Sequence, residues 1–354
     1  MAFLSIYPES LEEDGFEGMG RRFTGSALLG WVGLVVLGLW GGRAYGAAAL
    51  LLEEPYGHFG GMNPTGHAAV YLSHVCAETP TEVRLCRPGE YGVVVSRYHK
   101  VGGYDWIAMP LIPYLYAVNE EGEIPVTVDK ERVAVLRDGY RREHLQGMIP
   151  DAEDGSMPDG NWTQLVGAAF DRTMYGFEMK TTREEDERFV AVLNDRKNVA
   201  HFNLFFRNCA DFSKIVLNTY YPHAIRRNVI ADLGMTTPKQ VARSMVKYGK
   251  KHPELDMNAF VIPQVDGSVP RSRHVNGVVE SLLKSKRYLV PLVILSPQVT
   301  GGALVAYLAS GRLDIPKDAE VFDLQAAKVK GKRGKAPPAE PVKSGTDAES
   351  TVGH

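Results

Sequence analysis

A run of uncharged residues near the start of the chain, from Phe23 to Gly42, limits where the rest of the sequence can fold. Its length matches the roughly 20 apolar residues that a helix needs to cross the core of a bilayer. Arg21 and Arg22 precede it, as on the cytoplasmic flank of such a helix. A buried core helix is the alternative, but the glycines in this run would weaken a helix in water. We therefore expect the chain to be exported.

The residues that follow this run fit a signal-peptidase cleavage site. Ala44 and Gly46 are small and stand two positions apart, a pattern that this enzyme accepts. Met19 would then be the true start, and cleavage would remove the segment up to Gly46. Without cleavage the same segment would stay as a membrane anchor. In both cases we assign residues 1–46 to a leader and expect a periplasmic or cell-envelope protein.

The three cysteines have different expected roles in an oxidising compartment. Cys76 and Cys86 flank a predicted turn, so they can form a disulfide and leave Cys209 as the free thiol. Two unpaired core cysteines are the alternative.

The overall composition excludes several classes of function. Forty basic and forty-two acidic residues leave a net charge of −2, which gives no reason to expect the basic face of a nucleic-acid-binding protein. With three cysteines and no finger-like histidine spacing, the chain is not expected to bind zinc. It also contains no glycine-rich phosphate loop and no nucleophile-elbow serine. We therefore expect no metal, no cofactor and no nucleic-acid partner.

Apolar periodicity and turn residues predict strands first and helices later in the chain. The predicted strands are His67–Ser73, Glu82–Cys86 and Gly92–Tyr98, with a further one within Ile124–Leu136. After an acidic loop at 151–160, the predicted helices are Asn161–Tyr175, Arg183–Asn194, Ala210–Tyr220 and one that Thr237 caps and Pro238 begins, running to about Tyr248.

The apolar segment Tyr288–Leu308 has two interpretations. It is either a second membrane span or two strands joined by a turn, because Pro291, Pro297 and a glycine pair count against a continuous helix. The sequence therefore predicts a folded domain over 47–287, an apolar segment over 288–309 and a mostly disordered basic, proline-rich tail over 310–354.

The motif Asn208-Cys209 stands at the predicted start of a helix. Asparagine is a good N-cap, so Cys209 would lie in the first turn, where free amides and the helix dipole lower the pKa of a thiol. The same amides can hold the oxyanion that forms when a thiolate attacks a carbonyl. A small buried core residue is the alternative interpretation. The helix presents one apolar face, made by Phe212, Ile215, Val216, Thr219 and Tyr220.

A thiol nucleophile also needs a base and a group that orients the base. His67 is the candidate base because it begins an apolar strand directly after Gly66; a structural histidine bonded to the backbone is the alternative. If that strand pairs with the next one through a turn near Ala77, the side chain nearest to His67 is Glu90, unless Glu90 is only a solvated turn residue. Asn203 and Asn208 are candidate oxyanion donors.

The segments Gly66–Leu72 and Leu204–Phe212, GHAAVYL and LFFRNCADF, together resemble the circularly permuted papain-like hydrolases. That group includes relatives of lecithin–retinol acyltransferase and the Lnb-type periplasmic domain, and in it the histidine strand precedes the cysteine helix. The likeness covers roughly residues 56–221, with a long insertion before Cys209. It implies an α+β, permuted papain-like fold in which an antiparallel sheet packs against the cysteine helix, with added helices.

The resemblance also implies an activity. Cys209 would attack an amide or ester carbonyl, His67 would be its base, and water, an amine or an alcohol would release the acyl group. Export suggests a peptide, cell-wall or lipid substrate and association with the membrane. Two alternatives remain: a membrane-anchored envelope protein that uses the same scaffold only for binding, and a lipid acyltransferase.

Overall fold

The computed structural model describes residues 45–57, 64–200, 202–227, 232, 234–310, 312–313 and 319–330. Nearly all of the predicted leader and the end of the predicted tail therefore lie outside the described residues. The strand β1 (Gly46–Glu53) was not predicted, and it begins at the residue that the sequence patterns placed last in the leader.

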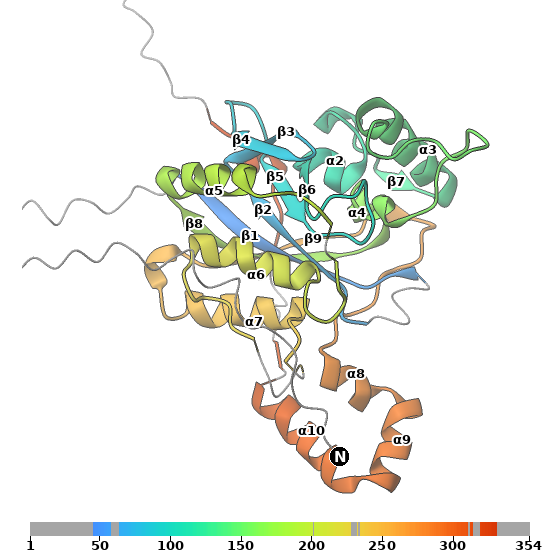
Figure 1. Cartoon of the computed structure of the whole chain (residues 1–354), viewed down its shortest axis with the longest axis vertical. Coiled ribbons are helices and arrows are strands. Elements are labelled where there is room, and N and C mark those ends of the chain that lie inside the picture. Colours follow the sequence, from blue (N-terminus) through green and yellow to red (C-terminus); the bar gives the residue numbers. More distant parts are fainter. Residues whose placement is uncertain are drawn as a thin grey trace, which may run out of the picture. The chain divides into compact units, whose positions relative to one another are not determined.

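The described residues form a mixed α+β structure built on a seven-stranded, mostly antiparallel sheet (Figure 1). The strand order is β11-β9-β8-β1-β2-β5-β6, so β1 lies in the middle of the sheet. In sequence order the remaining strands of this sheet are β2 (His67–Leu72), β5 (Val93–Ser96), β6 (Ile107–Pro110), β8 (Met174–Thr181), β9 (Asn258–Ile262) and β11 (Glu320–Val321). Only the pairing of β11 with β9 is parallel within this described sheet.

Both faces of the sheet are covered, which explains why its central strands are apolar at nearly every position. Along β1, Leu50 and Leu52 pack into one core cluster, whereas Ala49 and Leu51 pack into the cluster on the other face. The helices α5 (Arg183–Asp195), α6 (Cys209–Tyr220) and α7 (Pro238–Gly249) contribute to the first cluster. The second receives residues from α2 (Leu111–Tyr116), α3 (Lys130–Tyr140) and α4 (Ala168–Asp171).

Several predicted elements are confirmed. The strands near His67, Glu82 and Gly92 are present, as are α5 and α6, and Thr237 caps α7 with Pro238 at its first position. The predicted disulfide between Cys76 and Cys86 is also present. It links β3 (Val75–Thr79) to the end of β4 (Glu82–Leu85), which pair with each other as a separate hairpin.

Other predictions are wrong. The segment Ile124–Leu136 contains only the two-residue strand β7 (Thr127–Val128), which pairs with β10 (Asp266–Gly267), and then the start of α3. The predicted helix Asn161–Tyr175 is instead a 3₁₀ turn (Asn161–Gln164), the short helix α4 and the first residues of β8. Short stretches of this kind carry too few turns for periodicity to separate a helix from a strand.

The C-terminal apolar segment is helical, so the interpretation as two strands is wrong. Helix α8 (Val278–Lys284) leads into α9 (Lys286–Leu295) and α10 (Pro297–Ser310), which are separated at Ser296. Among the helices that the structure describes, none is both long and apolar enough to cross a membrane. The last described helix is α11 (Leu324–Ala327).

Candidate active site

Cys209 is the first residue of α6, as the sequence predicts. The Asn208 side chain accepts a hydrogen bond from the Asp211 N–H (3.0 Å), and the Asp211 carboxylate accepts one from the Asn208 N–H (3.3 Å), which completes a capping box. Thr236 donates a further hydrogen bond to Asp211 from a distant loop (2.6 Å). Cys209 is a free, half-buried cysteine whose position is fixed by this cap.

The chemical state of the thiol differs from the sequence-based expectation. Burial raises the pKa of Cys209 to about 11, whereas the backbone N–H groups of Ala68, Ala210 and Cys209 itself lower it only in part. The helix terminus does act in the expected direction, but the loss of water outweighs it because a thiolate is costly to bury. At neutral pH Cys209 is therefore a neutral thiol.

His67 begins β2 and is held there by the turn before it. Gly66 has a φ of +70°, and a Cβ at this position would lie 2.2 Å from the Glu53 carbonyl oxygen. Only glycine fits such a conformation and such a close approach without strain. Because β2 pairs antiparallel with β1, Glu53 is the direct partner of His67 in the sheet.

Ser96 on β5 defines the tautomer of His67. The Ser96 hydroxyl lies 2.9 Å from His67 Nε2 and donates a hydrogen bond to the Ala68 carbonyl oxygen (2.8 Å). A serine hydroxyl has one proton, and the carbonyl oxygen can only accept, so both contacts are hydrogen bonds only if Nε2 carries a proton and donates it to Ser96. Nδ1 is then the unprotonated nitrogen, which is the one that can accept a proton.

The surroundings of His67 favour its neutral form. Its ring stacks on Tyr98, with 4.7 Å between the ring centroids. Burial, and then the positive charge of Arg172, hold the pKa of His67 well below its usual range. The resting pair is therefore a neutral thiol and a neutral imidazole.

A buried polar chain lies behind the imidazole. The Tyr98 hydroxyl donates to the Tyr114 hydroxyl (3.3 Å), Tyr114 donates to the Glu53 carboxylate, and Glu53 forms an ion pair with Arg172 (2.8 Å). Both members of this ion pair are almost completely buried. Removing either partner would leave an uncompensated buried charge. These polar contacts therefore hold Tyr98 in place, and the His67 ring stacks on Tyr98.

Cys209 and His67 line the same cavity, whose volume is about 890 Å³. Helix α6 packs across β2, and this contact brings together two residues that are far apart in the sequence. The cavity wall is mostly apolar, with Tyr56, Phe202, Leu204, Phe205, Met235 and Val278 among its residues. Its size and character are those of a site for a small molecule or for part of a larger one.

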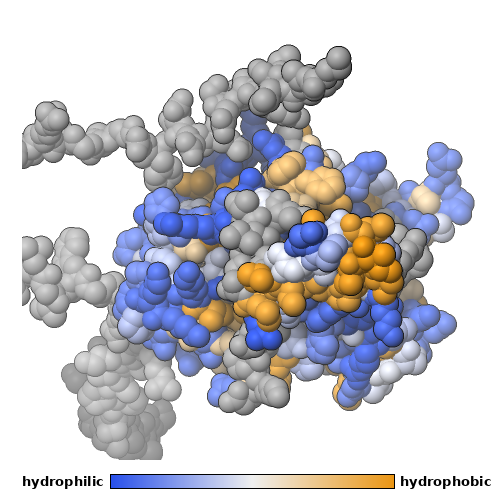
Figure 2. All heavy atoms as spheres, turned by 90° about the horizontal axis from the view of Figure 1, so that it is seen from below, coloured by the Kyte–Doolittle hydropathy of each residue, from blue (hydrophilic) through white to orange (hydrophobic). Residues whose placement is uncertain are grey.

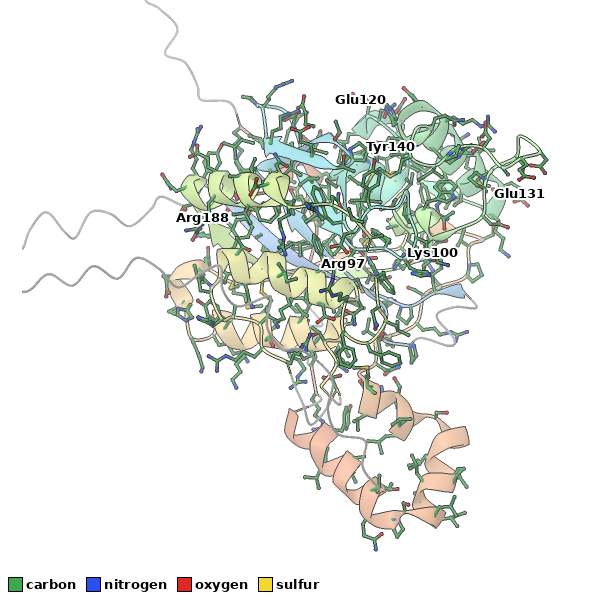
Figure 3. All side chains as sticks on the ribbon, in the orientation of Figure 1. Arg97, Lys100, Glu120, Glu131, Tyr140 and Arg188 are labelled. Carbon is green, nitrogen blue, oxygen red and sulfur yellow. A yellow bond between two sulfur atoms is a disulfide. The ribbon has the colours of Figure 1, made fainter. Side chains whose placement is uncertain are left out.

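Arg97 lies in the cavity wall and is paired with an acidic neighbour. Its guanidinium pairs with Asp105 (2.6 Å) and lies over the Phe212 ring of α6, 5.3 Å from the ring centroid. Figure 3 labels Arg97 beside one end of α6. Asp105 neutralises the charge of Arg97. The contact with Phe212 connects the end of β5 to the cysteine helix, so Arg97 has a packing role as well as bordering the cavity.

Glu90 does not orient His67, and the predicted pairing behind that role is wrong. The strand β2 pairs with β1 and β5, whereas the next hairpin, β3–β4, forms a separate sheet. Glu90 instead receives two hydrogen bonds from the Arg84 guanidinium (2.6 and 2.8 Å), which lower the pKa of its carboxyl group. The orienting group is Ser96, and the only sequence signal for it is a polar residue that ends the apolar run Val93–Val95.

The two candidate oxyanion residues both line the cavity. The Asn203 side-chain oxygen accepts a hydrogen bond from the Phe205 N–H (2.9 Å). The Asn208 amide already donates to the carbonyl oxygens of Leu204 (3.0 Å) and Thr236 (3.1 Å) while its oxygen caps α6. Asn208 is therefore a structural residue, and the backbone N–H groups of Cys209 and Ala210, which face the Cys209 sulfur, are the remaining candidate donors to an oxyanion.

One group of residues in the described part of the chain has the geometry of a metal site: Cys76, Cys86 and Glu90. The two sulfur atoms are joined in the disulfide, so they are not thiolate ligands.

Fold and site together define a mixed α+β protein with a cysteine at a helix start and an oriented histidine in one large cavity. No protein-family model, no curated protein and no solved structure matches this chain.

Proposed function

We propose that this chain is an exported thiol enzyme on a permuted papain-like fold, with Cys209 as nucleophile and His67 as base. The observation that carries the proposal is the orientation of His67: its Nε2 is held by Ser96, which leaves Nδ1 as the base in a cavity that Cys209 also lines. The order of the elements supports the permuted fold, because the histidine strand β2 precedes the cysteine helix α6.

The proposed reaction begins with the neutral pair. As Cys209 Sγ attacks the carbonyl carbon of an amide or ester, His67 Nδ1 takes the thiol proton, and the backbone N–H groups at the start of α6 stabilise the oxyanion. Collapse of the tetrahedral intermediate breaks the C–N or C–O bond, and the imidazolium returns the proton to the leaving nitrogen or oxygen. His67 then deprotonates water, which hydrolyses the thioester and restores the thiol.

The cavity and the disulfide support the substrate class and the location. The largely apolar wall of the cavity suits a substrate with an apolar group next to the scissile bond, such as a lipid or an acylated or peptide component of the envelope. The disulfide between Cys76 and Cys86 is typical of a protein that folds in an oxidising compartment.

A series of p-nitrophenyl esters with acyl chains of increasing length tests this proposal. We expect hydrolysis by the full chain to increase with chain length and to be lost in both Cys209→Ala and His67→Ala. If Cys209→Ala still hydrolysed the ester faster than the ester hydrolyses spontaneously without protein, the proposal would be contradicted.

A second candidate function is a binding protein that uses the apolar cavity without chemistry. The raised thiol pKa favours it, because a catalytic cysteine is usually acidified. Under this alternative a fatty acid would bind to the cavity with the same affinity in wild type and in Cys209→Ala, and no ester would be hydrolysed.

A further inference from the structure

Helices α9 and α10 have an apolar surface that is exposed to solvent. Of the large hydrophobic side chains that are exposed in the described part of the chain, a group of eight belongs to these two helices. Its members are Val290, Val293, Ile294, Leu295, Val299, Leu304, Val305 and Leu308. Ile294 and Leu295 are 72% and 79% exposed, and they lie where α9 ends and α10 is about to begin. An exposed cluster of this size marks an interaction surface.

The two helices leave the domain and return to it. Helix α9 follows directly on α8, and Tyr307 near the end of α10 donates a hydrogen bond to Glu280 of α8 (3.2 Å). Glu280 is in turn bonded to Lys239 of α7 (2.6 Å), which attaches this base to the domain. Figure 1 shows α9 running away from the sheet and α10 coming back toward it. We call α9 and α10 the hairpin, and the turn around Ser296 its tip.

The charges around the hairpin specify its partner. Between Ser281 and Leu313 the sequence has no acidic residue, and its basic residues lie at the two ends of this segment. Lys286 and Arg287 are the first two residues of α9, Arg312 follows α10, and Lys284 of α8 forms an ion pair with Glu280 (2.7 Å). The apolar tip and the cationic base together complement the acyl chains and the head groups of an anionic lipid surface. Figure 2, seen from the side on which the hairpin lies in Figure 1, shows hydrophobic groups in orange among hydrophilic ones in blue.

The helix lengths limit how deeply the hairpin can insert. With ten and fourteen residues, α9 and α10 are about 15 and 21 Å long, whereas the hydrocarbon core of a bilayer is about 30 Å thick. We propose that the hairpin inserts its tip into one leaflet of an anionic lipid bilayer, with the basic residues of both ends at the same surface. Val278, the first residue of α8, lines the cavity that holds Cys209, so insertion places the membrane next to that cavity.

A fluorescent label at the tip tests the proposal on the full chain. Ile294→Cys in a Cys209→Ala background would carry an environment-sensitive fluorophore, and Val126→Cys, an 88% exposed position, would be the control. With vesicles of neutral and anionic phospholipids, we expect the label at 294 to shift to the blue and to be quenched by lipids spin-labelled in the acyl chain. The label at 126 should not respond. This readout reports the hairpin itself, whatever residues 23–42 do.

Two further measurements separate the alternatives. We expect Lys286→Gln together with Arg287→Gln to weaken vesicle binding of the label at 294 about tenfold or more. Fluorophores attached at Lys284→Cys and at Arg312→Cys should both be chemically reduced by dithionite added outside the vesicles. If the segment spanned the membrane, one of the two fluorophores would lie inside the vesicle and would be protected.

Three outcomes would overturn the proposal. The first is a label at 294 that does not respond to lipid. The second is a blue shift that depends only on protein concentration, which means that a second copy covers the hairpin. The third is a blue-shifted emission that depends neither on lipid nor on protein concentration, which means that another segment of the same chain covers the hairpin.

Discussion

Cys209 and His67 are both neutral at rest, and this decides how their chemistry must be tested. Burial raises the pKa of the thiol to about 11 and lowers that of the imidazole, so the state with a thiolate and an imidazolium is disfavoured on both sides. The proton then moves during the attack on the carbonyl, with Nδ1 as acceptor. A reagent that requires a preformed thiolate should react slowly.

Alkylation by iodoacetamide measures this state directly. We expect the rate at Cys209 to rise about tenfold per pH unit from pH 7 toward a midpoint near 11, and to be slower at pH 7 than for a free cysteine, whose pKa is about 8.5. The Cys209→Ala variant, which keeps only the two disulfide-bonded cysteines, gives the background rate of alkylation. A rate that is already constant between pH 5 and 7 would mean a preformed ion pair and would contradict this description of the site.

Ser96 acts through His67, so its removal should affect catalysis more than binding. We expect Ser96→Ala to lower kcat for ester hydrolysis roughly 10- to 100-fold with little change in KM, because the imidazole loses its fixed tautomer. Ser96→Thr, which keeps the hydroxyl, should recover most of the activity. The ¹⁵N chemical shifts of His67 provide the structural readout: a mixed tautomer in wild type would show that Ser96 does not have this role.

At the scale of elements, the turn between β1 and β2 positions His67. Gly66 is held by a positive φ and by the close approach of the Glu53 carbonyl oxygen, whereas Gly89 has a positive φ of +94° and open space around it. We expect Gly66→Ala to lower the free energy of unfolding by about 3 kcal/mol or more, through backbone strain and overlap together. Gly89→Ala, which adds only the strain, should cost about 1 kcal/mol.

Chemical denaturation of the two alanine variants measures this difference. Equal losses of stability at the two positions would show that the contact with Glu53 does not hold the turn.

Helix α5 contains Asp186, a buried titratable group that lies outside the candidate active site. Burial raises its pKa to about 7, so between pH 4 and 7 the unfolded chain loses a proton that the folded protein keeps. The folded state is therefore favoured by this group at low pH, and that contribution is lost as the pH rises through 7. We expect Asp186→Asn to raise the melting temperature relative to wild type more at pH 8 than at pH 4.5.

Glu187→Gln is the matched control, since Glu187 lies on the same helix, is exposed and pairs with Arg183. Calorimetry of the three proteins at both pH values gives the comparison. A shift for Asp186→Asn that is the same at pH 4.5 and pH 8 would contradict the raised pKa.

The site could be predicted from the sequence only where its features are local. The N-cap by Asn208, the start of α6 at Cys209 and the start of β2 at His67 depend on a few neighbouring residues, and these are confirmed. The partner of His67 depends on strand order, which is set by contacts between β1, β2 and β5 that no local pattern encodes. The sequence therefore places Glu90 in the wrong strand pairing and does not identify Ser96 as the partner of His67.

The thiol pKa and the C-terminal segment show the same limit. The helix terminus is visible in the sequence, but the burial that outweighs it exists only after β2, β5 and α6 have packed together. In the sequence, the prolines at 291 and 297 count against a continuous helix. In the structure Pro297 begins α10, where a proline is tolerated, and Pro291 lies inside α9.

For the whole molecule, the central claim is that Cys209 takes up an acyl group as a thioester, with His67 acting as its base. Intact-mass spectrometry of the full chain after a short pulse of a p-nitrophenyl ester tests it most directly. We predict one added acyl group on Cys209 that disappears as product forms, and almost no adduct within the same time in His67→Ala. An adduct that forms equally fast without His67, or one that lies on a lysine and persists in Cys209→Ala, would contradict the claim.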